Sequence, residues 1–148
     1  MVVRRYQDLI AWQLAERFKL EVYGLVLGSA GAQRDLRFTS QILEAARGVP
    51  SDITEGFLRC SPGDFARFLD YAIASLGEAE QRLNDGIQLK YFAAEACAEA
   101  FRLARRCLTA SVRLKQSQKR YLQAKQAKTR APTSRGEEKP KPDGEVDA

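Results

Sequence analysis

The residue types best suited to chemistry in this chain are the cations that crowd its C-terminal third. From Arg102 to Lys128 there are nine arginines and lysines and no aspartate or glutamate. A helix with charges of one sign suits the phosphate backbone of a nucleic acid, because each contact releases a condensed counterion. The alternative is a solvated outer face, whose cations also favour the negative C-terminal end of the helix dipole. The candidate nucleic-acid-binding residues are Arg102, Arg105, Arg106, Arg113, Lys119 and Arg120.

Groups that could perform catalysis are scarce. The chain contains no histidine, so a helical nuclease that relies on an arginine and a histidine would lack a proton carrier near neutral pH. No glycine-rich loop precedes a Lys-Ser or Lys-Thr pair, which argues against nucleotide hydrolysis. Cys60 has no visible base beside it in the sequence. We therefore predict that the protein is not an enzyme and has no cofactor and no small-molecule substrate.

Three glutamates raise the question of a carboxylate-bridged metal centre, namely Glu55, Glu78 and Glu80. Such centres in helical bundles normally add Glu-x-x-His motifs, so no metal site is predicted. We predict instead a polar cluster that links the second and third helices or faces a neighbouring subunit, with Arg59 and Arg67 as the nearest charge partners. Its predicted members are Ser40, Gln41, Glu55, Arg59, Ser75 and Glu78.

The cysteines and the hydropathy pattern indicate a reducing compartment and no membrane association. Cys97 and Cys107 lie ten residues apart on one predicted helix, about 15 Å, which is too far for a disulfide. They are predicted to be small core residues. No window approaches the roughly 20 apolar residues of a membrane span, and the N-terminal residues do not resemble a signal peptide. We therefore expect a cytoplasmic protein.

Apolar periodicity and cap signals predict four helices that would position these groups. The first covers residues 7–27 and the second residues 34–58, with Pro50 inside its apolar stripe as a kink or boundary. The third begins at Ser61-Pro62, a strong start signal, and is predicted to stop at Asn84-Asp85-Gly86. The fourth starts near Ala94 and carries the cationic series.

Four helices with short links and no strand pattern predict an all-α fold. The expected architecture is an antiparallel up-down-up-down four-helix bundle formed by residues 1–127. Residues 128–148 are rich in Thr, Pro, Ser, Gly and mixed charge, which predicts a disordered tail.

Several short motifs occur together along the first three predicted helices. They are Tyr6-x-Asp8-Leu9-x-x-Trp12, Thr39-Ser40-Gln41-Ile42, Ala45-Ala46, Val49-Pro50, Ile53, Glu55-Gly56 and Arg59, then Ser61, Phe65, Arg67, Phe68, Leu69, Ala72, Ser75, Leu76, Glu78, Glu80 and Leu83. In these residues the chain resembles the four-helix bundle proteins encoded in intervening sequences of bacterial large-subunit (23S) ribosomal RNA genes. The resemblance covers roughly residues 6–121.

The resemblance implies a left-handed antiparallel bundle that self-associates, in characterised relatives as a ring-like pentamer. The accessory proteins of diversity-generating retroelements are a similar group, whose basic pentamers bind nucleic acid and a reverse transcriptase. This chain differs from the family pattern in its second helix, where Leu43 and Glu44 stand in place of two arginines and Asp52 in place of an asparagine. These changes make that helix more acidic.

The first helix is predicted to carry the subunit interface. Beside its core stripe it has a second apolar row, which exceeds what one internal core needs. The candidate interface residues are Leu9, Trp12, Tyr23 and Val26, and for Trp12 the alternative is packing in the core against the second helix. We therefore predict a non-enzymatic homo-oligomer that is its own main partner. The alternative is an accessory factor that binds RNA or DNA through its fourth helix.

Overall fold

The computed structural model describes residues 2–130, which fold into helices connected by short links. In chain order the elements are a 3-10 helix Tyr6–Asp8, α1 Ile10–Leu27, α2 Ala30–Arg34, α3 Leu36–Leu58, α4 Pro62–Gln88, a 3-10 helix Glu95–Cys97 and α5 Ala98–Arg130. Residues 2–130 contain no β-strand. The predicted all-α fold is confirmed. No helix in this part of the chain is long and apolar enough to cross a membrane.

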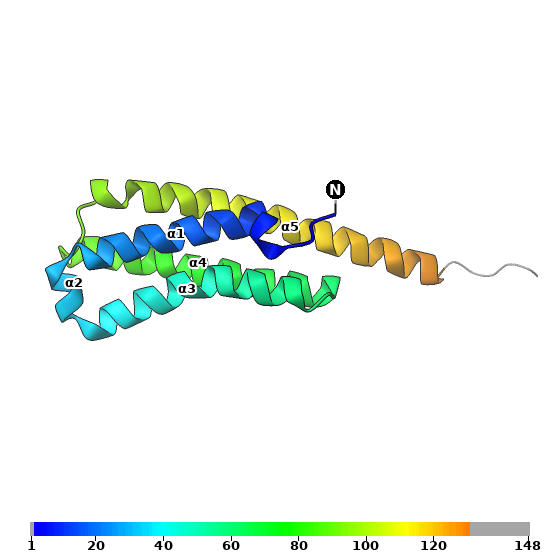
Figure 1. Ribbon diagram of the computed structural model, residues 1–148, viewed down its shortest axis with the longest axis horizontal. Coiled ribbons are helices and arrows are strands. Elements are labelled where there is room, and N and C mark those ends of the chain that lie inside the picture. The colour runs from blue at the N-terminus through cyan, green and yellow to red at the C-terminus, as the bar shows by residue number, and fades with distance from the viewer. Residues whose placement is uncertain (1, 131–148) are drawn as a thin grey trace, which may run out of the picture.

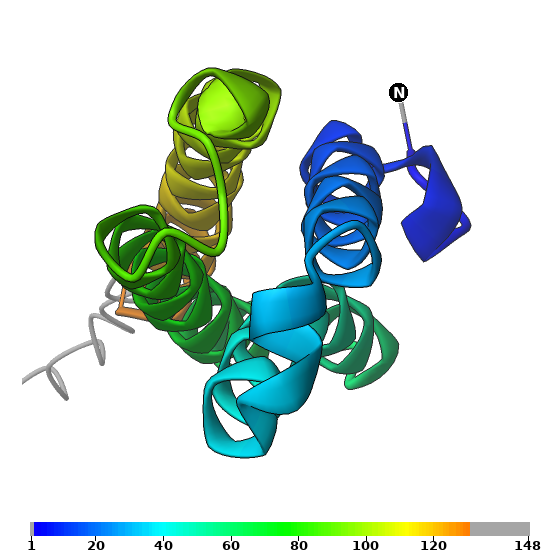
Figure 2. The ribbon, with the colours of Figure 1, turned by 90° about the vertical axis from the view of Figure 1, so that its left-hand side faces the viewer.

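The four long helices lie side by side, and the short α2 joins α1 to α3 at one end (Figures 1 and 2). Helix α1 packs against α3 and α5, and α4 packs against the same two helices. Along the chain, successive long helices run in alternating directions (Figure 1). As a result, the α1–α5 pair and the α3–α4 pair form two different faces of the molecule (Figure 2).

One apolar core runs between the four long helices. It is built from residues that recur at steps of three and four along each helix, which keeps them on one side. The largest fully buried side chains in it are Phe18, Val22, Ile42, Val49, Ile53, Leu69, Leu83, Leu103, Cys97 and Cys107. The burial of Cys97 and Cys107 confirms their prediction as small core residues.

The second predicted helix, residues 34–58, corresponds to α3, and the short α2 that precedes it was not predicted. Asp35 separates α2 from α3, and its Oδ1 accepts a hydrogen bond from the Phe38 backbone N–H at 3.1 Å. Its Oδ2 accepts one from the Tyr91 hydroxyl at 2.8 Å, and these two bonds lower the pKa of Asp35. Ser61 caps α4 through the Asp64 backbone N–H, as predicted. Helix α3 continues without a break through the buried Pro50.

The predicted stop at Asn84-Asp85-Gly86 is wrong, because α4 continues to Gln88. Gly86 is buried within the helix, and a Cβ there would lie 2.5 Å from the ring of Phe92 and 3.0 Å from that of Phe38. The glycine is therefore needed for close packing of two aromatic rings on α4. The reversal of the chain occurs later, at Lys90, which has a φ of 63°.

Helix α5 is longer than the predicted domain boundary allows. It continues to Arg130, so residues 128–130, predicted as the start of the tail, are helical. Its C-terminal end extends past the turn between α3 and α4 (Figure 1). Residues 123–130 are all exposed. The rest of the predicted tail, residues 131–148, lies outside the described residues.

Candidate functional site

The predicted nucleic-acid-binding residues are all exposed on α5. Four of them, Arg102, Arg106, Arg113 and Arg120, are spaced by four, seven and seven residues, which keeps them on one side of the helix. Arg106, Arg113 and Arg120 are each separated from the next by about 10 Å along the helix axis. These four residues are called the arginine row below. The structure thus arranges part of the predicted series as a straight line of cations.

Two of the predicted cations are engaged within the chain. Arg102 donates two hydrogen bonds to the carboxylate of Glu99, at 2.6 and 2.8 Å, which lower the pKa of Glu99 and raise that of Arg102. Arg105 lies toward α4, where its charge opposes the rise that burial causes in the pKa of Glu80. A third cation of the helix, Lys115, pairs with Asp70 of α4. Within residues 2–130, Arg106 and Arg113 form no ion pair.

The predicted polar cluster is divided between two places. Gln41, Ser75 and Glu78 line one cavity of about 440 Å³ in the groove between α3 and α4. Glu55 and Arg59 instead form their own ion pair at 2.9 Å, one turn apart near the end of α3. Ser40 is exposed and does not line that cavity. The prediction of a single cluster is therefore wrong.

Arg59 was correctly predicted as a charge partner of Glu55, whereas Arg67 pairs with Asp64 at 3.0 Å. The guanidinium of Arg59 also lies 4.6 Å from the ring centre of Phe68, and that of Arg67 lies 5.5 Å away. Such cation–π contacts hold both arginines against the surface of α4.

Sequence reasoning missed five of the eight residues around the polar cavity, here called the α3–α4 groove cavity. Glu44, Gly48, Asp52 and Arg82 also line it, with Ala45. Asp52 Oδ2 accepts a hydrogen bond from Ser75 Oγ at 3.4 Å, and burial raises the pKa of Asp52. The missed signal was their spacing, because positions 41, 44, 48 and 52 share one side of a helix.

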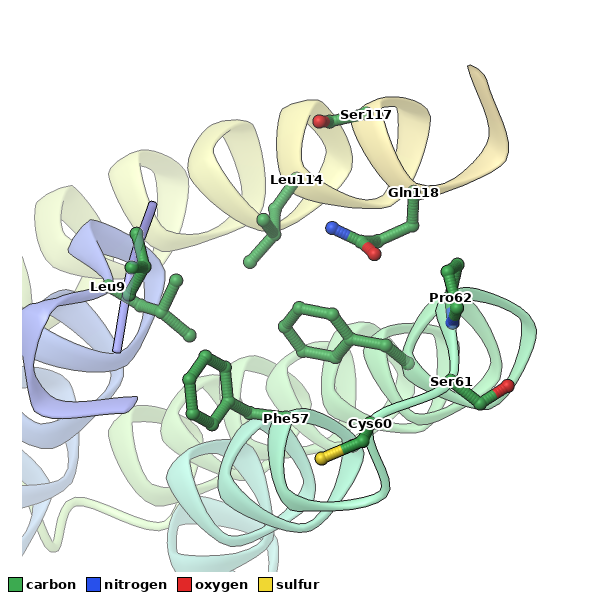
Figure 3. A pocket seen from close by; sticks show the side chains of 11 residues that line it. Leu9, Phe57, Cys60, Ser61, Pro62, Leu114, Ser117 and Gln118 are labelled. Carbon is green, nitrogen blue, oxygen red and sulfur yellow. The ribbon is translucent and has the colours of Figure 1, made fainter. Parts of the chain in front are cut away.

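An apolar cavity of about 380 Å³ lies where the N-terminal segment, the α3–α4 turn and α5 meet (Figure 3). Leu9, Phe57 and Leu114 point into it, while Ser117 and Gln118 lie toward its α5 side (Figure 3). Cys60 lines it with a φ of 56°. The part of the chain that the structure describes places no carboxylate at this cavity.

The predicted subunit interface on α1 assumed that its four residues form a second, exposed apolar row, and this assumption is wrong. Leu9 and Val26 are buried in the core of the single chain, at 7% and 3% exposure, so they do not form an exposed row. Trp12 and Tyr23 are half-buried and have partners. Trp12 packs edge-on against Tyr6, and the Tyr23 hydroxyl accepts a hydrogen bond from Arg47 Nε at 2.8 Å. The exposed large apolar side chains of α1 are Ile10, Leu20 and Leu27.

The three cysteines are expected to differ sharply in reactivity toward a thiol reagent. Burial raises the pKa of Cys107 to about 11 and also raises that of Cys97, so both stay protonated at pH 8. Cys60 is exposed. We expect one thiol per chain to react with Ellman's reagent at pH 8, and the other two only in denaturant. A Cys60→Ser variant is the control, and rapid reaction of two thiols in the folded protein would contradict the burial.

Most of the helical part of the chain matches a known protein family. Residues 7–110 match the family model described as 23S rRNA-intervening sequence protein. This match spans α1 to α4 and the first part of α5, including the α3–α4 groove cavity and the start of the arginine row. A search of curated proteins finds no match. Since the family model covers well over half of the chain, the protein belongs to the 23S rRNA-intervening sequence protein family.

Proposed function

We propose that this protein is a non-enzymatic, cytoplasmic scaffold that assembles into a homo-oligomer. Its fold is proposed to be the antiparallel up-down-up-down four-helix bundle expected of the family. The contacts of α1 with α3 and α5, and of α4 with the same two helices, support this because they form a closed circuit of neighbours. A pentamer is the stoichiometry that the family resemblance favours.

The observation that carries self-assembly is an exposed row on α1. Its residues alternate at steps of three and four and are all exposed: Ile10, Gln13, Arg17, Leu20, Gly24 and Leu27. Ile10, Leu20 and Leu27 have exposures of 67%, 55% and 74%. A row with this spacing is the pattern by which one helix packs against another. A monomer would leave these three side chains in water, whereas an oligomer would bury them.

Light scattering coupled to gel filtration tests the proposal at micromolar concentration. A pentamer of the 16.6 kDa chain has a mass of about 83 kDa, five times that of the monomer. Leu20→Glu places a charge in the row and is expected to lower the mass. Leu36→Glu, at an exposed leucine on the first residue of α3, is the control and should have no effect. A wild-type mass of 16.6 kDa would refute the proposal.

A second candidate function, favoured by the one-signed charge of α5, is binding to the backbone of RNA or DNA. The helix has no acidic residue after Glu99, and its exposed C-terminal end carries Lys119, Arg120, Lys125, Lys128 and Arg130. Several phosphate contacts would give salt-sensitive binding with little sequence preference. An assembly would strengthen a weak site by presenting several copies of it.

Fluorescence anisotropy with a labelled oligonucleotide, measured over a salt series, tests this second function. We expect binding at about 50 mM salt and a loss of about tenfold or more by about 200 mM, as several released counterions require. Lys119→Glu with Arg120→Glu should weaken binding, whereas deletion of residues 131–148, which contain three cations and five acids, should not weaken it. Absence of wild-type binding at about 50 mM salt would leave the cations as a solvated face.

A further inference from the structure

The α3–α4 groove cavity has an excess of negative charge that residues 2–130 do not neutralise. Three carboxylates line it, from Glu44, Asp52 and Glu78, and none of them forms an ion pair within residues 2–130. Arg82 lines it too, but it is paired with Asp85 at 3.4 Å. The two neutral polar residues, Gln41 and Ser75, complete a cavity that offers mainly acceptors.

The arginine row on α5 has the opposite surplus. Arg106 and Arg113 are exposed and form no ion pair in the described part of the chain. Arg106 helps to lower the pKa of Glu99, but the carboxylate of Glu99 already accepts two hydrogen bonds from Arg102. Helix α5 therefore presents two free guanidinium groups, whose planar donors match carboxylates in pairs.

These two charged features lie at the same height along the bundle. Lys115 pairs with Asp70, and Arg105 influences Glu80, which fixes how α5 lies against the antiparallel α4. Arg106 consequently lies level with about residue 79 of α4 and Arg113 with about residue 72, each about one turn from Ser75. Ser75 lines one end of the cavity, where its hydroxyl donates a hydrogen bond to Asp52 of α3, and Glu78 and Arg82 line the cavity further along α4. Arg106 thus lies level with the cavity, and Arg113 lies level with its Ser75 end.

They also lie on different faces of the molecule. The arginine row is continuous with the exposed row of α1, since Arg17 of that row lies 3.8 Å from Glu99 of α5. The cavity is on the α3–α4 face, which also exposes Leu58 and Tyr71. A contact between unlike faces of identical chains is heterologous, and it produces a closed ring or an open filament.

From this match of charge and height we propose that the α3–α4 groove cavity of one copy binds Arg106 and Arg113 of a second copy. The α1–α5 face of each subunit then covers the α3–α4 face of the next, with no shift along the helix axes. Leu20 and its row pack beside the charged contact. The inference rests on the proposed self-assembly and names its interface. Two of its acids, Glu44 and Asp52, belong to this chain's own departures from the family pattern.

Charge reversal, followed by light scattering and by circular dichroism to verify folding, tests the interface. Arg106→Glu with Arg113→Glu is expected to raise the concentration at which the assembly dissociates by about tenfold or more, and Glu44→Lys with Glu78→Lys to do the same. The quadruple variant should recover assembly, because the two reversed charges again match. Lys119→Glu with Arg120→Glu, on the same helix but beyond the cavity's height, is the control.

A neutral pair, Arg106→Gln with Arg113→Gln, provides the same test without new repulsion should a reversed chain fold poorly. An oligomer that none of these changes weakens would overturn the inference and leave self-assembly intact. A wild-type monomer would refute both. Unchanged mass together with lost oligonucleotide binding in the Arg106→Glu, Arg113→Glu variant would assign these arginines to nucleic acid and also overturn the inference.

Discussion

Phe18→Ala is expected to destabilise the protein by about 3–5 kcal/mol, the largest effect of any single substitution considered for this chain. Phe18 is completely buried at the centre of α1 and packs within the core shared by the four long helices. Truncation to alanine removes most of a ring from the core and leaves a cavity that surrounding helices fill only in part. Urea unfolding followed by circular dichroism at one fixed protein concentration measures the change.

Leu20→Ala is the matched control, because Leu20 lies two residues away on α1 and is 55% exposed. Its loss should change the unfolding free energy of the isolated chain by about 0.5 kcal/mol or less. In the assembled protein it should also weaken association. A Phe18→Ala variant as stable as Leu20→Ala would contradict the placement of α1 against the core.

The core of α4 could be predicted from the sequence almost residue by residue. Phe65, Leu69, Ala72, Leu76, Ala79 and Leu83 recur in the sequence at alternating steps of four and three, and all six are buried. A helix that packs against two neighbours needs only an uninterrupted apolar side, so periodicity alone determines which residues face inward. The Ser61-Pro62 start was predictable for a similar reason, since its cap involves only neighbouring backbone.

Features that depend on contacts between distant segments could not be predicted in this way. Gly86 has the local chemistry of a helix stop, yet the ring of Phe92 requires a glycine inside the helix at that point. Leu9 and Val26 have the spacing of a surplus row on α1, yet both complete the core. In each case a tertiary contact, invisible in the local pattern, outweighs the local preference.

The predicted polar cluster also depends on contacts between distant segments, which the sequence pattern does not reveal. Glu55 lies 14 residues after Gln41 on α3, about 21 Å along the helix, so the two cannot line one small cavity. The family motif places both in a recurring block of sequence, but sequence alone does not give the height at which α3 and α4 cross. The hydrogen bond between Ser75 and Asp52 sets that height in the structure. It thereby selects Glu44, Asp52 and Glu78 as neighbours.

Helices α3 and α4 also approach each other closely at Gly56, about one turn beyond the Asp52 end of the groove cavity. A Cβ at this position would lie 2.7 Å from Phe68 Cβ and 3.4 Å from Phe65 Cα. Both atoms are at or next to the backbone of α4, so no side-chain rotation relieves the clash and the helices must separate. Gly56→Ala gains about 1 kcal/mol of helix propensity but incurs about 1–3 kcal/mol of overpacking.

We therefore expect Gly56→Ala to lower the unfolding free energy by up to about 2 kcal/mol, the overpacking cost less the gain in propensity. Gly77→Ala on α4 is the control, because its Cβ would meet no atom within 4 Å and the change should stabilise the chain by up to about 1 kcal/mol. Because both substitutions replace a helical glycine by alanine, the gain in helix propensity is common to both, and the difference between their unfolding free energies reports the packing at Gly56. Because Gly56→Ala also forces apart the walls of the groove, it should weaken assembly where Gly77→Ala does not. Equal stabilisation by both substitutions would show that α3 and α4 do not pack this closely.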